Sequence, residues 1–381
     1  MKSRLHILSA PTSIFLAISG RCNMNCKHCN VGDHQNKNIP ELTTEQWKKF
    51  FDELEELKVF RIRISGGEPF VRKDIYELMD YMQEKHFWID INTNATLIDE
   101  EGARRIGRYP KVGNIMVSLD GSNEKVYEML RGKGTWKKAV KGIENLIRYN
   151  GRRVSFYCTV TKYNVDDIEN MIELVKSWGQ TGGIKFNFII PGGNADIFFK
   201  YISLNDKERR DLINRTPELK EKYGNLISGT IFDSYYMFKR IEENYKKFKD
   251  KMKEPAYITG CGTVRNEVTV RFEGNVTPCD RLSHMVCGNI LEQNLKDIWL
   301  HSPVLNEFRK RLDMTLDDFE ECRDCEYKYF CTGGCPAVSM SFRNTIFGYD
   351  PLSCYKVYTL EKEFLPENEF NERKQQQEIK S

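Results

Sequence analysis

Three cysteines near the amino end of the chain could hold a metal cofactor. Cys22, Cys26 and Cys29 have the spacing C-x3-C-x2-C. Three thiolates this close in sequence can bind one face of a [4Fe–4S] cube, which ordinarily takes four cysteine ligands. One iron would then lack a protein thiolate and would be open to another molecule. A zinc knuckle, with His28 or His34 as the fourth ligand, and disulfides are the alternatives.

A glycine-rich motif follows the next apolar stretch. Gly66 and Gly67 would let the backbone approach a ligand closely, and the Glu68 carboxylate can accept hydrogen bonds. An ordinary glycine turn is the alternative. Together with the cysteine loop, the segment from Gly66 to Pro69 resembles the radical S-adenosylmethionine (SAM) superfamily. The resemblance implies that SAM binds the open iron and is cleaved to a 5′-deoxyadenosyl radical, which abstracts a hydrogen atom from a substrate.

The same resemblance implies further contacts to SAM. The Gly66–Glu68 segment would accept hydrogen bonds from the SAM amino group. Asn94, Ser118 and Asp120 stand where the family contacts the ribose or the methionine part. Arg131 stands where the family has an arginine that binds the carboxylate, and a guanidinium suits that group because it can donate two parallel hydrogen bonds. A surface turn is the alternative for Arg131.

A second group of cysteines lies in the last third of the chain: Cys261, Cys279, Cys322, Cys325, Cys331, Cys335 and Cys354. A C-x2-C pair alone could belong to a zinc ribbon, but seven cysteines are too many for one zinc and one short of two four-cysteine sites. The run C-x2-C-x5-C-x3-C after a Gly-x4-Cys element resembles the SPASM domain. This domain extends radical SAM enzymes that modify peptides and proteins.

The SPASM resemblance implies two auxiliary [4Fe–4S] clusters, which with the SAM-binding cluster would make three. The nearer cluster would take Cys261, Cys279 and Cys335. The outer cluster would take Cys322, Cys325, Cys331 and Cys354. Cys287 could be a further ligand or a structural thiol, and Cys158 is expected to be a small core residue.

Asp280 directly follows Cys279. In anaerobic sulfatase-maturing enzymes, an aspartate at this place is the base in the oxidation of a substrate Ser or Cys. The resemblance therefore makes Asp280 the candidate catalytic residue, and a surface carboxylate is the alternative.

An alternation of strands and helices would position these residues. From residue 13 to about 190, short stretches rich in Ile, Val and Phe alternate with amphipathic segments, as in a parallel sheet covered by helices. The expected strands are 13–19, 60–65, 88–93, 114–119, 153–160 and 184–190. Six such repeats predict an α/β fold, a partial (βα)6 TIM-like barrel. The SPASM resemblance adds a small C-terminal iron–sulfur domain to this fold. The candidate residues follow the strand ends, where ligands bind in such barrels.

Local signals place some helix starts. Thr43 with Gln46 has the pattern of a capping box, and Asp74 is expected to begin the next helix. Asn164 is expected to cap a helix over 165–178.

The chain divides into four expected parts. Residues 1–195 would form the radical SAM core and residues 256–358 the SPASM domain. Residues 196–255, charged and rich in aromatic residues, would be a helical bridge, with a lid as the alternative. Residues 359–381 are rich in Glu, Lys and Gln and are expected to be a disordered tail.

Charge and composition limit the partners and the cellular compartment that we expect for the protein. The chain has 58 Lys and Arg against 55 Asp and Glu, and this net charge of +3 gives no argument for nucleic acid or a membrane as a partner. No apolar stretch approaches the ~20 residues of a membrane helix. Twelve cysteines suit metal binding in a reducing compartment, so a cytoplasmic protein is expected.

The expected function is that of a radical SAM oxidoreductase acting on a ribosomal peptide, with a thioether or carbon–carbon cross-link as the product. The resemblance implies an external electron donor of the flavodoxin or ferredoxin type. The first strand starts near residue 13, which leaves no room for a leader-binding domain, so a separate leader-peptide-binding protein is a further expected partner. The alternatives are sulfatase-maturing oxidation of Ser or Cys, tetrapyrrole side-chain decarboxylation on the haem pathway, and a non-catalytic iron–sulfur or zinc scaffold.

Overall fold

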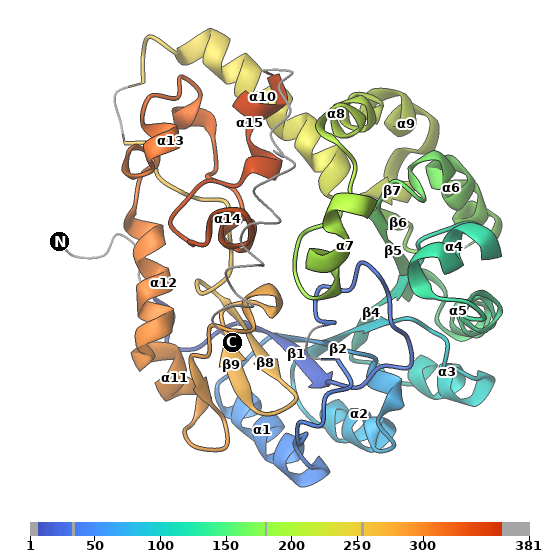
Figure 1. Ribbon diagram of the computed structural model, residues 1–381. Coiled ribbons are helices and arrows are strands. Elements are labelled where there is room, and N and C mark those ends of the chain that lie inside the picture. Colours follow the sequence, from blue (N-terminus) through green and yellow to red (C-terminus); the bar gives the residue numbers. More distant parts are fainter. Residues whose placement is uncertain (1–6, 33–34, 180, 253–254, 360–381) are drawn as a thin grey trace.

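A curved sheet of ten strands runs through the molecule (Figure 1). The computed structural model describes residues 7–32, 35–179, 181–252 and 255–359, so His34 and nearly all of the expected tail lie outside the described residues. The strand order is β10-β9-β8-β1-β2-β3-β4-β5-β6-β7. All strands from β8 to β7 in this order are parallel, whereas β9 and β10 pair antiparallel.

The six predicted strands are all present. They are β1 (Ser13–Ser19), β2 (Arg61–Gly66), β3 (Trp88–Thr93), β4 (Val112–Ser118), β5 (Val154–Val160) and β6 (Ile184–Phe188). The helices between them are α1 (Thr44–Glu56), α2 (Ile75–Gln83), α3 (Glu100–Gly107), α4 (Glu124–Arg131), α5 (Trp136–Asn150) and α6 (Ile168–Ser177). This alternation confirms the predicted α/β fold with a partial (βα)6 barrel.

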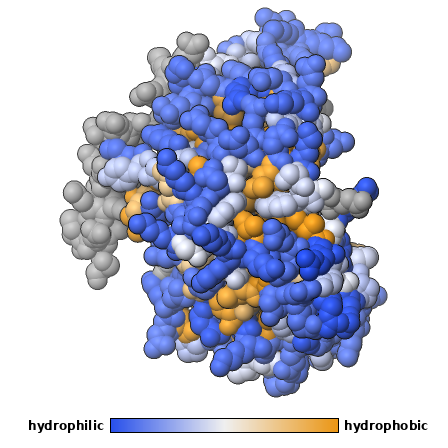
Figure 2. Space-filling view, turned by 90° about the vertical axis from the view of Figure 1, so that its right-hand side faces the viewer, coloured by the Kyte–Doolittle hydropathy of each residue, from blue (hydrophilic) through white to orange (hydrophobic). Residues whose placement is uncertain are grey.

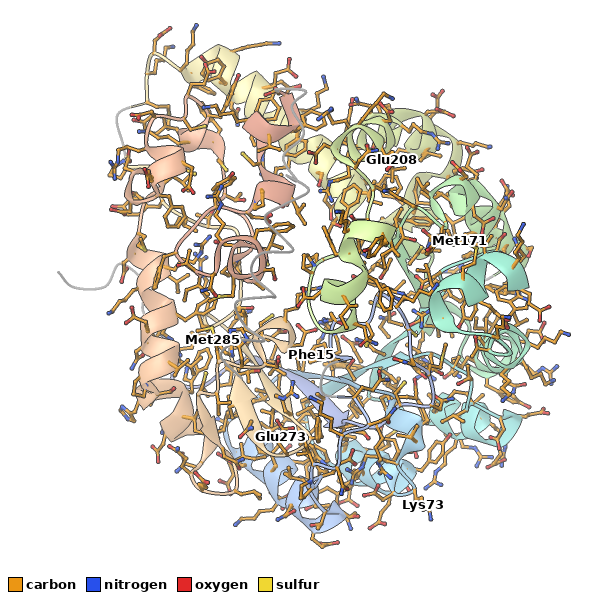
Figure 3. All side chains as sticks on the ribbon, in the orientation of Figure 1. Phe15, Lys73, Met171, Glu208, Glu273 and Met285 are labelled. Atoms are coloured by element: carbon orange, nitrogen blue, oxygen red, sulfur yellow. The ribbon has the colours of Figure 1, made fainter. Side chains whose placement is uncertain are left out.

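The two faces of the barrel strands have different surroundings. Side chains alternate between the faces of a strand. In β2, Ile62 and Ile64 belong to the main hydrophobic core, while Arg63 and Ser65 line an interior cavity. Figure 3 shows Phe15 of β1 on the inner side of the sheet and Met171 of α6 in the outer helical layer. The outer face of the sheet therefore packs into the hydrophobic core beneath the helices, and the inner face borders a cavity that can bind ligands.

The outer helices are amphipathic, as predicted. Helix α1 begins with the expected capping box, in which Thr43 and Gln46 each accept a hydrogen bond from the other's backbone N–H. Its apolar face is buried, with Trp47 and Phe51 fully enclosed. The opposite faces are exposed, and Figure 2 shows a largely hydrophilic surface over the helices on the right of Figure 1, with hydrophobic side chains in a few separate groups.

The expected start of α6 is wrong. A 3-10 turn, Val165–Asp167, precedes the helix, which begins at Ile168, and Asn164 makes no capping hydrogen bond. Asn164 is instead fully buried, and its Nδ2 donates to the carbonyl oxygens of Asp120 and Thr159 at 3.1 and 3.0 Å. A buried amide must find partners, so Asn164 joins the ends of β4 and β5.

The region expected as a helical bridge also contributes a strand. Its elements are α7 (Asn194–Ile202), α8 (Asp206–Asn214), α9 (Thr216–Tyr223), β7 (Ile227–Ser228) and α10 (Thr230–Phe248). Strand β7 pairs with β6 and extends the sheet by one parallel strand. Helix α10 then crosses the top of the molecule in Figure 1, from the barrel toward the C-terminal elements.

The C-terminal region shares the sheet of the barrel. Its strands are β8 (Glu267–Arg271), β9 (Asn275–Thr277) and β10 (Gly288–Asn289), and its helices are α11 (Leu295–His301), α12 (Pro303–Asp313), α13 (Glu320–Arg323), α14 (Pro336–Arg343) and α15 (Tyr355–Thr359). The predicted hairpin is confirmed, and Gly274 takes a positive φ of 91° at its turn. Because β8 pairs with β1, it covers an edge that would otherwise be open. Within the described residues, no helix combines the length and apolar character needed to cross a membrane.

Candidate active site

A cavity of about 540 Å³ occupies the inner face of the barrel. It is lined by strands from both parts of the chain and by the loop after β1. Its walls contain these predicted site residues: Cys22, Cys26, Cys29, Gly66, Gly67, Glu68, Asn94, Ser118, Arg131, Cys279 and Asp280. The fold thus brings the first cysteine group, most of the predicted SAM residues and Cys279 of the second cysteine group to the same cavity.

The cysteine loop is held by side chains from outside it. The Oδ1 atom of Asn36 accepts the Cys22 backbone N–H at 2.9 Å, and Gln35 donates to the Met24 carbonyl at 2.9 Å. Asn194, at the start of α7, donates to the Cys26 carbonyl at 3.1 Å. The loop conformation is therefore fixed by the protein itself, which presents the three thiols together at the cavity wall.

The two glycines of the Gly-Gly-Glu-Pro motif allow a close approach between two loops. Gly66 has a φ of 125°, and a Cβ there would lie 2.3 Å from the Ser19 carbonyl oxygen. A Cβ on Gly67 would lie 2.2 Å from the carbonyl oxygen of Arg21. Any larger residue would push the end of β2 away from the cysteine loop, so the glycines set the distance between the motif and the thiols.

Glu68 joins the ends of two strands. Its side chain is 1% exposed and accepts hydrogen bonds from the Thr93 hydroxyl and the Asn94 backbone N–H, both at 2.7 Å. Burial raises the pKa of Glu68 to about 7. The carboxylate fixes the end of β3 against the motif and brings Asn94 to the cavity.

Asp120 and Arg131 form a buried pair beneath the cysteines. The Asp120 carboxylate is fully buried and accepts from Arg131 Nε at 2.5 Å and from the Thr159 N–H at 2.7 Å, while His28 Nε2 lies 3.1 Å away. Burial alone would raise the pKa of Asp120, but Arg131 and His28 lower it well below its usual range. Arg131 Nη1 lies 3.9 Å from Cys26 Sγ.

Asp120 and Arg131 were both predicted to contact SAM, but the structure places them differently. Arg131 lines the cavity, but Asp120 is not among the cavity-lining residues. The guanidinium of Arg131 is held from behind by Asp120 and faces the site. The contact of Asp120 with SAM stays a prediction, and its observed partners are protein groups.

The second cysteine group separates into two sets. Cys322, Cys331 and Cys354 pack around one small hydrophobic cluster. Burial, followed by repulsion from Cys331, Cys354 and Cys325, raises the pKa of Cys322 to about 12, so these four thiols are neighbours.

The other set is Cys261, Cys279 and Cys335, of which Cys279 lines the cavity. Burial is the main cause that raises the pKa of Cys335, and the nearby Cys261 thiol raises it further. Burial likewise raises the pKa of Cys279, and Cys335 adds to that increase. The grouping of neighbours is the same as the grouping of expected cluster ligands. Their role as ligands stays a prediction.

Asp280 connects the two cysteine regions. It opens a 3-10 turn, Asp280–Leu282, and its Oδ2 accepts from Asn30 Nδ2 at 3.1 Å. Asn30 directly follows Cys29, and the Cys279 thiol lies 3.3 Å from the other carboxylate oxygen of Asp280. The carboxylate therefore faces the cavity between the first cysteine loop and the β9 end.

The two remaining cysteines lie in the core. Cys158 is fully buried in β5, as predicted, and Cys287 is 7% exposed. The Cys287 thiol donates to the Met285 carbonyl at 3.4 Å, and Ser302 and Arg309 also act on it. Neither cysteine lines the cavity. This environment is that of a structural thiol.

Sequence reasoning missed several residues that line the cavity. Arg63 in β2, Tyr157 in β5, Lys185 in β6 and Arg281 in the turn after Cys279 all reach it. Arg63 and Lys185 are charged residues that alternate with buried apolar residues in their strands, and this alternation was a signal that could have found them. Arg281 carried no such signal, because a charged residue after a strand is common.

The arrangement of the thiols fits an iron–sulfur cluster better than a single ion. Among the described residues, no three His, Cys, Asp or Glu side chains converge closely enough to hold one metal ion. Ligands of a cube bind separate corners and are spread wider than the ligands of one zinc. The three thiols of the first group, next to a cavity with Arg131 and Asn94 on its wall, therefore suit a cluster with one open corner.

Two family models match the chain. The model of the Radical SAM superfamily matches residues 16–175, and that of the SPASM iron–sulfur cluster-binding domain matches residues 261–326. The chain belongs to the radical SAM superfamily. It is a radical SAM enzyme with a C-terminal SPASM domain, and SAM and iron–sulfur clusters are its cofactors. The predicted family is thereby confirmed.

Several curated proteins are similar over most of their length. Mycofactocin maturase MftC of Mycolicibacterium smegmatis is 28% identical over 90% of this chain and 83% of that protein. An AdoMet-dependent heme synthase of Methanosarcina barkeri is also 28% identical, over 91% of this chain and 97% of that protein.

Solved structures share the fold. SuiB of Streptococcus suis, bound to its precursor peptide SuiA, has a TM-score of 0.70 at 18% identity and covers 91% of this chain and 76% of that one. Native anSMEcpe with bound AdoMet and a Kp18Cys peptide has a TM-score of 0.68 at 22% identity, over 91% and 95% of the two chains. At these identities the likeness supports the fold, including the predicted C-terminal SPASM region.

Proposed function

We propose that this enzyme cleaves SAM and uses the 5′-deoxyadenosyl radical to abstract hydrogen from a ribosomally made peptide, which becomes cross-linked through a thioether or carbon–carbon bond. One observation carries the proposal: a single cavity is lined by the first three cysteines, all of the predicted SAM residues except Asp120, and Cys279 with Asp280. Similarity to a mycofactocin maturase over nine-tenths of the chain, and the fold shared with SuiB bound to its precursor peptide, support a peptide as substrate.

Ten cysteines are assigned to three [4Fe–4S] clusters. Cys22, Cys26 and Cys29 would hold the cluster that binds SAM and supplies the electron for its cleavage. The nearer auxiliary cluster would be held by Cys261, Cys279 and Cys335. The outer auxiliary cluster would be held by Cys322, Cys325, Cys331 and Cys354. The neighbour relations among these thiols support the division.

The protein groups around the first cluster would bind and orient SAM. The backbone of the Gly66–Glu68 segment would receive the amino group, and Arg131 would bind the carboxylate. Asn94 and Ser118 would contact the ribose or methionine part. For Asp120 the fully buried ion pair favours a positioning role, in which the carboxylate holds the Arg131 guanidinium toward SAM.

Asp280 is proposed as the group that accepts a proton from the substrate. It lines the cavity, and Asn30 orients its carboxylate through a 3.1 Å hydrogen bond. A base in this position would lie between SAM and the nearer auxiliary cluster, next to a substrate bound in the cavity.

Four further expectations complete the proposal. An external donor of the flavodoxin or ferredoxin type would reduce the SAM-binding cluster, and a separate protein would bind the leader of the peptide. The enzyme would act in the cytoplasm. Residues 1–195, 196–255 and 256–358 would be the core, the helical bridge and the SPASM domain.

The test is anaerobic reconstitution followed by iron, sulfide and product analysis. The wild-type enzyme is expected to bind about twelve irons, because three clusters hold four each, and to release 5′-deoxyadenosine from SAM with a reductant. Cys26→Ala is expected to lose about four irons and all SAM cleavage. Cys287→Ala is the matched control and should keep the full iron content. Stoichiometric zinc without iron would contradict the proposal.

A second function has one specific observation in its favour. The similarity to the AdoMet-dependent heme synthase covers 97% of that protein, so no large region of it is unmatched. Tetrapyrrole side-chain decarboxylation is therefore the second candidate. Mass spectrometry after co-expression with a peptide encoded beside the gene separates the two, because cross-linking removes two hydrogens. Loss of carbon dioxide from a tetrapyrrole would instead support the second function.

A further inference from the structure

Three cations line the cavity without a direct ion pair. The side chains of Arg63, Lys185 and Arg281 reach the cavity, and none of them forms a hydrogen bond or close ion pair with another described side chain. The Nε atom of Arg281 is buried without a hydrogen-bond partner among the described residues. The contact of Arg63 is with a ring, its guanidinium carbon lying 6.0 Å from the centroid of Phe15. Buried donors without acceptors are rare, and each one calls for an explanation.

The cavity carboxylates do not fill this role. Glu68 is bonded to Thr93 and Asn94, and Glu267 at the start of β8 accepts from the Ser13 hydroxyl at 3.0 Å. Asp280 accepts from Asn30, and its charge acts on the neighbouring Arg281 only through space. Each carboxylate on the wall therefore has a protein donor other than these cations.

Two of the cations reach the same part of the cavity. Arg281 acts electrostatically on Tyr157 in β5, and Tyr157 is the register partner of Lys185 in β6. Side chains of register partners project from the same face of a sheet. Arg281 and Lys185 thus border Tyr157 from two directions, on the β5–β6 side of the barrel, whereas Arg131 is already paired with Asp120.

We propose that Arg281 and Lys185, with Arg63 as a third cation on the same wall, form a subsite for a carboxylate group of the substrate. Resting on the function proposed above, this names the chemistry that the substrate must present beside Asp280. A guanidinium with a free N–H binds a carboxylate through charge-assisted hydrogen bonds, which are among the stronger ones in proteins. SAM itself would use Arg131, so these cations stay available to the second ligand.

A carboxylate could come from a peptide or from a tetrapyrrole side chain, and the experiment has one arm for each. Reconstituted holoenzyme with SAM is titrated with coproporphyrin III and with its tetra-amide, followed by the porphyrin absorbance. In the second arm, a pool of octapeptides with free C-terminal carboxylates is compared with the same pool amidated, and bound peptide is quantified by mass spectrometry.

In at least one arm the acid is expected to bind about tenfold more tightly than the amide, because a hydrogen bond between charged groups contributes more than a neutral one. Arg281→Gln and Lys185→Gln should each reduce this preference. The exposed residues Arg152 and Lys138 give matched controls, Arg152→Gln and Lys138→Gln, which should keep it. The arm that shows the preference identifies the source of the carboxylate.

The subsite is overturned if neither arm distinguishes acid from amide, or if the preference survives in both cavity variants. Lys185 is an exposed residue, so Lys185→Gln should fold even where Arg281→Gln does not. Release of 5′-deoxyadenosine by the wild-type enzyme without any probe reports on the proposed function separately. A wild-type enzyme that cleaves SAM but shows no acid preference would refute only the subsite.

Discussion

The two sides of the active-site cavity differ in how their charges are satisfied. On the side of the first cysteine loop, Asp120 is bonded to Arg131 and lies beside His28, and Glu68 is bonded across two strand ends. On the side of β6 and the turn after β9, Lys185 and Arg281 have no such direct partner among the described side chains. The contrast teaches that the charges of one wall are paired within the protein, whereas the cations of the other wall are left for a ligand.

This difference suits the two ligands of a radical SAM enzyme. Every turnover uses the same compound, SAM, and a wall whose charges are already paired and held in place binds it without reorganisation. A wall with unpaired cations is less stable in the free enzyme. The same cations interact favourably with an anionic group of the substrate when it binds. The following predictions compare the two walls, from the largest expected effect to the smallest.

Asp120→Asn should have the largest effect on stability. The substitution keeps the shape but leaves the buried Arg131 cation without its counter-charge, which is expected to lower the free energy of unfolding by about 3–5 kcal/mol. Urea unfolding followed by circular dichroism measures it. Adding Arg131→Met should restore much of the loss, since no unpaired charge then remains. A single variant as stable as the wild type would show that the paired wall is not held by this ion pair.

Gly67→Ala tests the close approach of the two loops. A Cβ 2.2 Å from the Arg21 carbonyl oxygen forces the backbone apart, with an expected cost of about 1–3 kcal/mol and a shifted cysteine loop. Unfolding measurements and iron content after reconstitution check both effects. A Cβ on Gly113 in β4 would have its nearest neighbour 3.4 Å away, so Gly113→Ala is the control. Equal behaviour of the two variants would argue against a steric role for Gly67.

Asn30→Ala should have a smaller effect at the junction of the two walls. It removes the hydrogen bond to Asp280, and about 1 kcal/mol of stability is expected to be lost. If Asp280 accepts the substrate proton, turnover with substrate should fall more than SAM cleavage without substrate. Comparison of the two rates in one preparation measures this, and a parallel fall in both would contradict the orienting role.

Lys185→Met should have the smallest effect on stability. Because Lys185 is exposed and has no ion pair among the described residues, its replacement is expected to change the free energy of unfolding by no more than about 0.5 kcal/mol. The same urea measurement applies. A loss as large as that of Asp120→Asn would remove the contrast between the walls.

Local patterns predicted the frame of the fold and the chemistry of the first site. The strands from Ser13 to Phe188 were recognisable because their outward side chains are apolar and must be covered by helices. The capping box at Thr43 was recognisable because it depends only on residues three apart. Asn164 was misread because its side chain bonds to the end of β4, which lies far away in sequence.

The sequence by itself determined which residues are candidates for the chemistry, because cysteine spacing and strand-end glycines are patterns of a few neighbouring residues. Only the tertiary structure decided which of them meet. Pairing of β8 with β1 brings Cys279, Asp280 and Arg281 to the cavity of a loop about 250 residues earlier, where Asn30 bonds to Asp280. The tertiary structure also decided that Asp120 lies buried behind Arg131, and that Lys185 lines the cavity. Strand pairing of this range depends on packing over the whole sheet, and no local preference specifies it.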